Sequence, residues 1–226
     1  MIKLIMPMAG KGTRFNETLP KPLIDVNGLP MFVQSERCIG LDFEERIFIT
    51  RKEHNMQPEI QKYYPGATVI EIDVDTQGTA CTLQIAEEYM HNGSLFVANC
   101  DQIVQWDKRF DWRSDGAIAV FHNPERNPKW SFAEVHDDRR VTRVAEKDPI
   151  SEWATVGWYY YRRGSFLKQA IADMIKAKDT VNDEYYTCPT YNYMIKRGMR
   201  ITSFEVQKMI GIGTAKDLND FHSTQR

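Results

Sequence analysis

Short apolar segments of strand length alternate with segments of helical periodicity through the first half of this chain. Such alternation is typical of an open, mostly parallel sheet with helices on both faces. We therefore predict an α/β fold whose central sheet is mostly parallel and flanked by helices. The expected strands are 3–8, 46–50, 68–72, 95–99 and 117–121, and the expected helices are 31–39, 57–64 and 79–90.

The second half of the chain has a different pattern. Three strand-like segments joined by short polar turns predict a small antiparallel patch. We expect this patch to lie over the mostly parallel, Rossmann-like sheet of the first half. No repeat, linker or low-complexity tract interrupts the chain, so we expect one domain over 1–226, with a core over roughly 1–121 and a second lobe with closing elements over 122–226. The expected strands here are 131–136, 141–146, 155–161 and 201–206, and the expected helices are 164–176, 186–197 and a last one after Thr214.

The composition argues against several classes of protein. Lys and Arg number 29 against 31 Asp and Glu, a net charge of −2, which gives no overall field to attract nucleic acid or an anionic membrane. No stretch approaches the ~18 apolar residues of a membrane span, and the N-terminal apolar run is too short for a signal peptide. Four widely spaced cysteines without a Cys-x-x-Cys pair favour thiols in a reducing compartment. We expect a cytoplasmic protein that binds neither nucleic acid nor membrane.

A glycine-rich loop follows the first expected strand, at the sheet edge where ligands bind in such folds. Gly10 and Gly12 let backbone N–H groups approach an anion. Arg14 and Lys21 add two cations, the second held between two prolines. Phe15 takes the place of the third glycine of a dinucleotide-binding fingerprint, and the order Gly-Lys-Gly-Thr is not that of a P-loop. The loop therefore predicts a polyphosphate site of another kind.

Two further segments are expected at the same edge of the sheet. Asp101 closely follows the expected strand 95–99; alone it reads as a solvated strand-end carboxylate, but beside a phosphate loop it suits Mg²⁺ on a triphosphate. Gln77, Gly78 and Thr79 open an expected helix, and their simplest role is a turn and an N-cap. Beside the same loop, the amide of Gln77 can pair with a nucleobase edge, while Gly78 lets the base approach the backbone.

Taken together, these segments resemble the signature of the sugar-phosphate nucleotidyltransferases, also called nucleoside-diphosphate-sugar pyrophosphorylases. The resemblance implies the nucleotide-diphospho-sugar transferase fold, in which the antiparallel patch is an acceptor-binding lobe. Segments 128–131 and 154–157 are most similar to the short, single-domain members of bacterial capsule gene clusters. The matching segments keep the family's order along nearly the whole chain: Gly10–Arg14, Lys21, Gln77–Ala80, Asp101, Glu146-Lys147, Gly157 and Gly213-Thr214.

The resemblance also implies a role for each matching residue. Arg14, Lys21 and Lys147 would be catalytic, and Asp101 would bind Mg²⁺. Trp158 and Tyr186 are further aromatic candidates beside the acceptor, although aromatic residues at such spacings more often pack in the core. No histidine has a metal-ligand spacing or a partnered nucleophile. The nucleotide would contact Met8, Ala9, Gly10, Gly12, Thr13, Gln77, Gly78 and Thr79, and the acceptor would contact Trp130, Glu146, Lys147, Gly157 and Tyr185.

The implied reaction is an in-line attack by an acceptor phosphate oxygen on the α-phosphorus of a nucleoside triphosphate, with release of pyrophosphate. Arg14 and the loop amides would hold the β- and γ-phosphates, Lys21 would stabilise charge at the α-phosphate, and Lys147 would steer the acceptor. A phosphate monoester is already largely ionised at neutral pH, so no general base is needed. The expected triphosphate is CTP, then UTP, and the expected acceptor is a sugar or polyol phosphate for capsular or surface polysaccharide. A homodimer would be unsurprising.

One position departs from the family pattern. Many members carry an aspartate two residues before the closing Gly-Thr as a second metal ligand, whereas this chain has Gly211. Either one metal suffices, or Asp183 or Glu184 supplies the second carboxylate. The departure keeps open a catalytically impaired nucleotide-binding or sensing protein of the same fold. A glycosyltransferase is disfavoured, because Asp101 is not part of an Asp-x-Asp motif.

Overall fold

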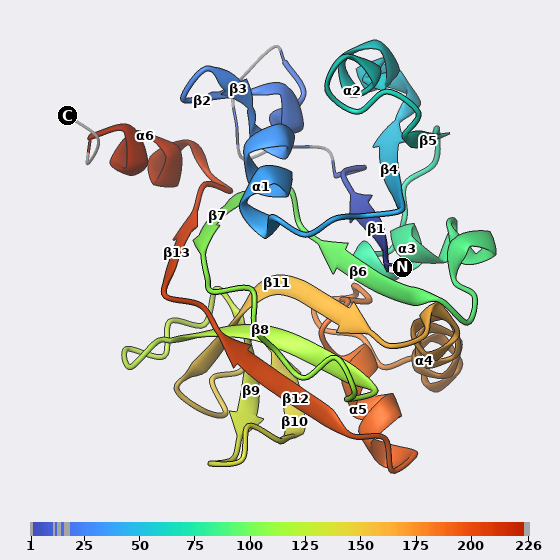
Figure 1. Ribbon diagram of the computed structural model, residues 1–226, viewed down its shortest axis with the longest axis vertical. Coiled ribbons are helices and arrows are strands. Elements are labelled where there is room, and N and C mark those ends of the chain that lie inside the picture. Colours follow the sequence, from blue (N-terminus) through green and yellow to red (C-terminus); the bar gives the residue numbers. More distant parts are fainter. Residues whose placement is uncertain (1, 11, 13–14, 16–18, 224–226) are drawn as a thin grey trace.

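The computed structural model describes residues 2–10, 12, 15 and 19–223 (Figure 1). Its centre is a nine-stranded mixed sheet formed by β1 (Ile2–Pro7), β4 (Glu45–Arg51), β5 (Thr68–Ile72), β6 (Ser94–Ala98), β8 (Gly116–His122), β9 (Ser131–Val135), β10 (Val141–Glu146), β11 (Trp153–Tyr161) and β12 (Ile201–Glu205). The order β10-β9-β11-β6-β1-β4-β5 runs across it, and β8 and β12 continue from β11 on a second path. Strands β6, β1, β4 and β5 are mutually parallel, whereas β11 is antiparallel to both β6 and β8.

Helices cover both faces of this sheet, and successive residues of a strand point to opposite faces, so a central strand contributes to both buried layers. In β1, Leu4 and Met6 join one buried cluster, and Ile5 joins another. The first cluster includes residues of α1 (Met31–Ile39) and α2 (Gln57–Tyr63), and the second includes residues of α3 (Thr79–Gln84), α4 (Gly164–Ala177) and α5 (Thr190–Lys196). The strand is therefore buried on both faces, as a central parallel strand should be.

A separate antiparallel ribbon joins the middle of the chain to its C-terminal part. Strand β7 (Gln102–Gln105) pairs with β13 (Lys208–Gly211), and Figure 1 shows the two strands side by side below α6 (Ala215–Ser223). Helix α6 contributes Leu218 and Phe221 to a third buried cluster, which also includes Phe15 and residues around the short hairpin of β2 (Asp25–Val26) and β3 (Leu29–Pro30). The ribbon thus places the closing Gly-Thr segment beside the end of β6.

The α/β architecture expected from the sequence is confirmed, with several differences in detail. The antiparallel strands β9 and β10 do not lie over the sheet but continue it through β11. The helix expected at 79–90 ends at Gln84, where i→i+3 bonds tighten the chain, and a short 3₁₀ turn, η3 (Glu87–Tyr89), follows. The helix expected at 186–197 begins only at Thr190, because Pro189 lacks an N–H and fits a helix start better than an interior.

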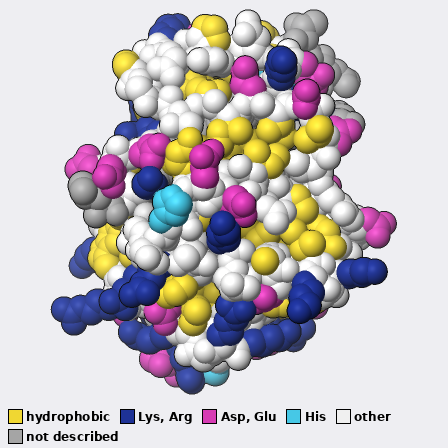
Figure 2. Space-filling view, turned by 90° about the vertical axis from the view of Figure 1, so that its right-hand side faces the viewer, with side chains coloured by type: hydrophobic (Ala, Val, Ile, Leu, Met, Phe, Trp, Pro, Cys, Tyr) yellow, Lys and Arg dark blue, Asp and Glu magenta, His cyan; other side chains and the backbone are white. Residues whose placement is uncertain are grey.

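The surface mixes charges of both signs. On the face shown in Figure 2, acidic and basic side chains stand among apolar ones, and Lys and Arg gather toward the lower half. This mixture agrees with the net charge of −2. Across the residues that the structure describes, no helix is both long and apolar enough to cross a membrane.

Candidate functional site

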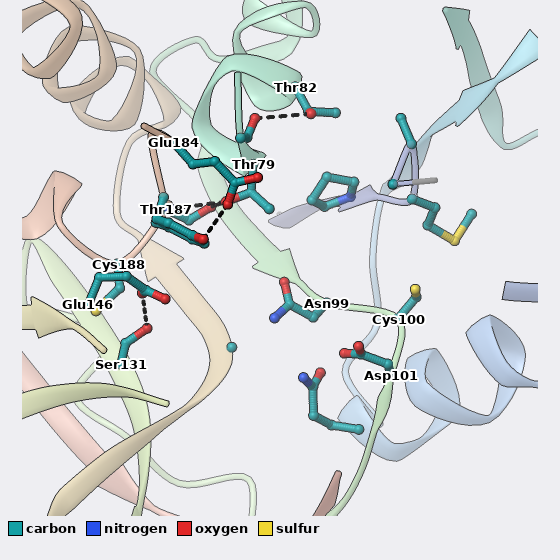
Figure 3. A pocket seen from close by; sticks show the side chains of 18 of the residues that line it. Thr79, Thr82, Asn99, Cys100, Asp101, Ser131, Glu146, Glu184, Thr187 and Cys188 are labelled. Carbon is teal, nitrogen blue, oxygen red and sulfur yellow. Dashed lines mark hydrogen bonds between the residues drawn. The ribbon is translucent and has the colours of Figure 1, made fainter. Parts of the chain in front are cut away.

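A cavity of about 770 Å³ opens where β1, β4 and β6 end, and its walls come from both halves of the chain. This is the edge at which ligands bind in open parallel sheets, and the volume suits a substrate-sized ligand. The loop after β1, the segment before α3 and the end of β6 form one part of the wall. Residues of β9, β10 and β11 and the segment before α5 form the other part, and Figure 3 shows Asp101 and Glu146 on opposite sides of the pocket.

The first wall carries an ion pair between Lys21 and Asp101. The Lys21 ammonium donates to Oδ2 of Asp101, and their side chains are only 15% and 19% exposed. Lys21 begins the 3₁₀ turn η1 (Lys21–Leu23), with a proline on either side that restricts its backbone. The buried Ser35 hydroxyl donates to the carbonyl of Cys100 at 2.8 Å and accepts from the N–H of Gln102 at 3.2 Å. These bonds hold the backbone on either side of the Asp101 carboxylate.

Glycines surround this ion pair closely. Gly12 has φ +64°, and a Cβ there would lie 3.2 Å from Cβ of Lys21. A Cβ at Gly213 would lie 2.8 Å from Oδ2 of Asp101, and the N–H of Ile212 donates to the Asp101 carbonyl at 2.9 Å. The closing Gly-Thr segment therefore packs directly against the carboxylate. The predicted residues Thr13 and Arg14 lie outside the described residues.

The predicted base-binding segment lies partly in the cavity wall. Gly78 and Thr79 line the cavity, as do Met8, Ala9 and Gly10. Gly78 has φ +98°, and a Cβ there would lie 2.5 Å from the carbonyl oxygen of Tyr185, so the glycine is needed for a close approach of two backbones. Gln77 is not among the lining residues, and its Nε2 donates to the carbonyl of Asp183 at 2.9 Å.

The second wall carries the predicted acceptor residues Glu146 and Lys147. Glu146 accepts a hydrogen bond from the Ser131 hydroxyl (Figure 3). Burial raises its pKa above the ordinary 4.5, while the bond from Ser131 and the charge of Lys147 act in the opposite direction. The Lys147 ammonium donates to the hydroxyl of Tyr186 and lies 4.4 Å from the centre of its ring, and Tyr186 donates in turn to Glu184. The wall thus combines one cation, two carboxylates and an aromatic face.

Gly157 lies in the same wall, at an irregularity of β11. The register between β11 and β8 shifts between Thr155 and Tyr159, and Gly157 has φ +87°. A Cβ there would lie 2.3 Å from Nδ2 of Asn99, and the N–H of Asn99 donates to the carbonyl of Gly157 at 3.1 Å. The glycine therefore lets the Asn99 side chain, which also lines the cavity, rest on β11.

Two of the aromatic candidates do not line the cavity. The side chain of Tyr185 is 8% exposed, belongs to a core cluster and does not line the cavity. Its backbone bonds to Gln77 and Ala80 turn it inward, so its neighbour Tyr186 faces the cavity instead. Trp158 is fully buried and packs edge-on against Phe96 and Trp106. Trp130, by contrast, does line the cavity.

Several lining residues were missed by the sequence reasoning. Arg51, Asp75 and Asn99 all line the cavity. Each lies at or just after the carboxyl end of an expected strand, so the same edge rule that indicated Asp101 could have found them. Thr187 also lines the cavity, and its backbone N–H and hydroxyl both donate hydrogen bonds to the Thr79 hydroxyl. It follows no expected strand, so the strand-edge rule could not have indicated it.

The residues present fit Mg²⁺ as an ion shared with a phosphate substrate. Among the described residues no group of three His, Cys, Asp or Glu side chains could hold a metal by itself. Mg²⁺ is commonly bound by one or two carboxylates together with substrate phosphates and water, and Asp101 offers one such carboxylate in the cavity. A Cβ at Gly211 would lie 2.9 Å from Cη2 of Trp130, so a larger residue there would require the indole ring to shift. Glu184 lines the cavity, and Asp183 does not.

Known structures share the overall fold of this chain. A nucleoside-diphosphate-sugar pyrophosphorylase from Vibrio cholerae has a TM-score of 0.85 and 25% identity, covering 96% of this chain and 98% of that one. A putative glucose-1-phosphate thymidylyltransferase from Bacillus anthracis has a TM-score of 0.79 and 20% identity, with 100% and 96% coverage. An inositol-1-phosphate CTP transferase from T. maritima has a TM-score of 0.74 and 13% identity, with 98% and 93% coverage. The fold is therefore the nucleotide-diphospho-sugar transferase fold.

Sequence comparison gives the family. A 2-aminoethylphosphonate cytidylyltransferase from Lancefieldella rimae is 22% identical, with 96% of this chain and 90% of the relative covered. The sequence pattern of the nucleotidyl transferase family matches residues 3–225, nearly the whole chain. The chain belongs to this family and is a nucleotidyltransferase, which confirms the resemblance drawn from its motifs.

Proposed function

We propose that this nucleotidyltransferase joins the nucleotidyl group of CTP, or of UTP as the second choice, to the phosphate of a sugar or polyol phosphate and releases pyrophosphate. The observation that carries the proposal is the lining of one cavity by a Lys21–Asp101 pair beside the glycine loop and by Lys147 on the other wall. Two separated cations are what a triphosphate and a second phosphate would need. The chain therefore offers a place for each reactant.

The chain's residues would act by position and charge, which is sufficient for phosphoryl chemistry of this kind. Backbone N–H groups around Gly10 and Gly12 would hold the triphosphate. Lys21 would neutralise charge that develops at the α-phosphate, and Lys147 would bring the acceptor phosphate into line. Glu146 would accept a hydrogen bond from a hydroxyl of the acceptor. No side chain needs to remove a proton, because the acceptor phosphate is already ionised at neutral pH.

Asp101 would also hold Mg²⁺, with the other ligands coming from the triphosphate and water. Mg²⁺ would supply neutralisation of the phosphate charge when it is bound. The one carboxylate at this point is compatible with the glycine at 211, because the substrate contributes the other oxygen ligands.

The names of the relatives support the choice of substrates. Two of them are named for the transfer of a cytidylyl group, one to 2-aminoethylphosphonate and one to inositol-1-phosphate. We therefore propose CTP before UTP and include small phosphonates and polyol phosphates among the acceptors. We further propose a role in capsular or surface polysaccharide synthesis, and action in the cytoplasm, where the four unpaired cysteines would stay reduced. The homodimer stays a prediction.

The test is pyrophosphate release from the purified protein with Mg²⁺. CTP, UTP, dTTP and GTP would each be offered alone and with a panel of sugar, polyol and aminoalkyl phosphates and phosphonates. Release that requires one triphosphate and one acceptor together would establish the reaction. Tight triphosphate binding without release from any combination would instead favour the nucleotide-sensing function, for which the glycine at 211 is the supporting observation. Absence of binding would contradict both functions.

A further inference from the structure

An arginine and an aspartate meet at the nucleotide end of the cavity, on two neighbouring strands. Arg51 is the last residue of β4 and is in register with Ile72, the last residue of β5. Asp75 follows three residues later, and its carboxylate accepts a hydrogen bond from Nη1 of Arg51 at 2.9 Å. Both residues line the cavity together with Thr76 and Gly78. The pair therefore lies beside the segment that the sequence predicts to contact the base.

The guanidinium of Arg51 is held in one orientation. Its side chain is 10% exposed, and its Nε donates to Oε1 of Glu53 at 2.6 Å. The two hydrogen bonds engage Nε and Nη1, and Nη2 takes part in neither. A planar guanidinium fixed in this way presents donors in a defined direction. Asp75 is 60% exposed on the cavity rim, and a carboxylate can accept several hydrogen bonds at once.

We propose that Arg51 and Asp75 recognise the pairing edge of the nucleobase and select cytosine over uracil. This inference rests on the proposed function, because it needs a triphosphate in the cavity. Cytosine presents the acceptors O2 and N3 and the amino donor N4, which match a guanidinium and a carboxylate respectively. Uracil replaces the amino group with the acceptor O4 and gives N3 a hydrogen. The O4 atom would face a carboxylate, and an unmatched polar contact of this kind disfavours the wrong ligand.

The selectivity can be measured without an acceptor. Isothermal titration of the protein with CTP and with UTP, each in the presence of Mg²⁺, gives the ratio of the two affinities. Asp75→Asn keeps the size of the side chain but adds an amide N–H₂ that can donate to O4. We expect this variant to lose about tenfold or more of the CTP preference, as for one hydrogen bond to a charged group. Arg51→Gln should weaken CTP more than UTP.

Glu53 supplies the matched control. It also bonds to Arg51 but does not line the cavity, and its side chain is 65% exposed. Glu53→Gln should therefore keep the CTP preference of the unmodified protein within about twofold, because the amide oxygen of glutamine can still accept the bond from Nε of Arg51 and the residue makes no contact with the base. If a thermal melt shows that Arg51→Gln is unfolded, Asp75→Asn still tests the assignment of the base contacts. The Asp75 side chain is largely in solvent, so its replacement should leave the fold intact.

The outcomes separate this inference from the proposed function. A preference for CTP that falls in Asp75→Asn and survives in Glu53→Gln would establish the assignment. Equal affinity of the unmodified protein for CTP and UTP, or an unchanged ratio in Asp75→Asn, would overturn it while leaving the transferase proposal intact. Failure of both triphosphates to bind would overturn both proposals.

Discussion

Replacement of Lys21 by alanine tests the proposed chemistry most directly. The Lys21 side chain is 15% exposed and its ammonium contacts Asp101 in the cavity wall. A Cβ added at Gly213 would lie 3.7 Å from Nζ of Lys21, so the closing segment packs close to it. The lysine is therefore placed before the substrate arrives. A preorganised charge of this kind acts on the transition state without reorganisation of solvent.

The expected magnitude follows from comparable single-donor losses. Removal of one preorganised donor at a developing negative charge costs roughly 10²–10³ in turnover, or about 3–4 kcal/mol. We expect Lys21→Ala to lower turnover by about 10²-fold or more. The variant also leaves the carboxylate of Asp101, whose side chain is 19% exposed, without the ammonium group that pairs with it. The loss should appear in kcat for pyrophosphate release at saturating triphosphate and acceptor.

A second lysine provides the control. Lys62 on α2 pairs with Glu59 on the same helix, is 62% exposed and does not line the cavity. Lys62→Ala should leave turnover within about twofold, because exposed ion pairs of this kind contribute little. Turnover near that of the unmodified protein in Lys21→Ala would refute the role given to Lys21, provided that the variant shows a normal thermal melt.

Three further predictions concern the site and its frame. Gly78→Ala should lower the free energy of unfolding in urea by on the order of 3 kcal/mol, because its Cβ would meet the Tyr185 backbone at 2.5 Å; Gly93→Ala, with open space around it, should stay within about 0.5 kcal/mol, and equal effects would contradict the argument. Burial raises the pKa of Glu146 above 4.5, so the folded state holds its proton more tightly, and the stability this contributes is lost as the pH rises through the raised pKa. In urea melts, the free energy of unfolding of Glu146→Gln should therefore fall less from pH 4.5 toward neutrality than that of the unmodified protein. An identical pH dependence of the two proteins would contradict the raised pKa of Glu146. Asp101→Asn should raise the Mg²⁺ concentration for half-maximal pyrophosphate release by about tenfold or more, whereas an unchanged Mg²⁺ titration would remove the metal role.

The sequence could predict the first wall of the site because one rule of parallel sheets covers it. Strand ends gather at one edge, so a loop after β1 and an aspartate after β6 must come close in space. The structure brings Lys21 and Asp101 together across 80 residues of chain, as this rule requires. The same rule extends to Arg51, which ends β4.

Other features depend on contacts that local patterns do not encode. The ribbon of β7 and β13 joins segments about 100 residues apart, and each strand has only four residues. Tyr185 is turned inward by backbone bonds to Gln77 and Ala80, which lie far from it in the sequence, so no local pattern indicates that Tyr186 is the residue that faces the cavity. Trp158 was a candidate for the acceptor site by residue type alone, but it lies on β11 in the middle of the sheet and is fully buried.

The pairing of β13 with β7 sets an order of events during synthesis on the ribosome. The backbone carbonyl of Asp101 accepts a hydrogen bond from Ile212, and Gly211 pairs with Gln102. The first wall of the cavity is therefore completed by residues that are synthesised long after β6. Domains begin to fold as the chain emerges, and the sheet from β1 to β6 can therefore form while the wall is still open. A chain interrupted before β13 would hold the glycine loop and Lys147 yet lack the segment that packs against Asp101. Nascent chains should accordingly acquire the complete nucleotide cavity only after β13 has left the exit tunnel.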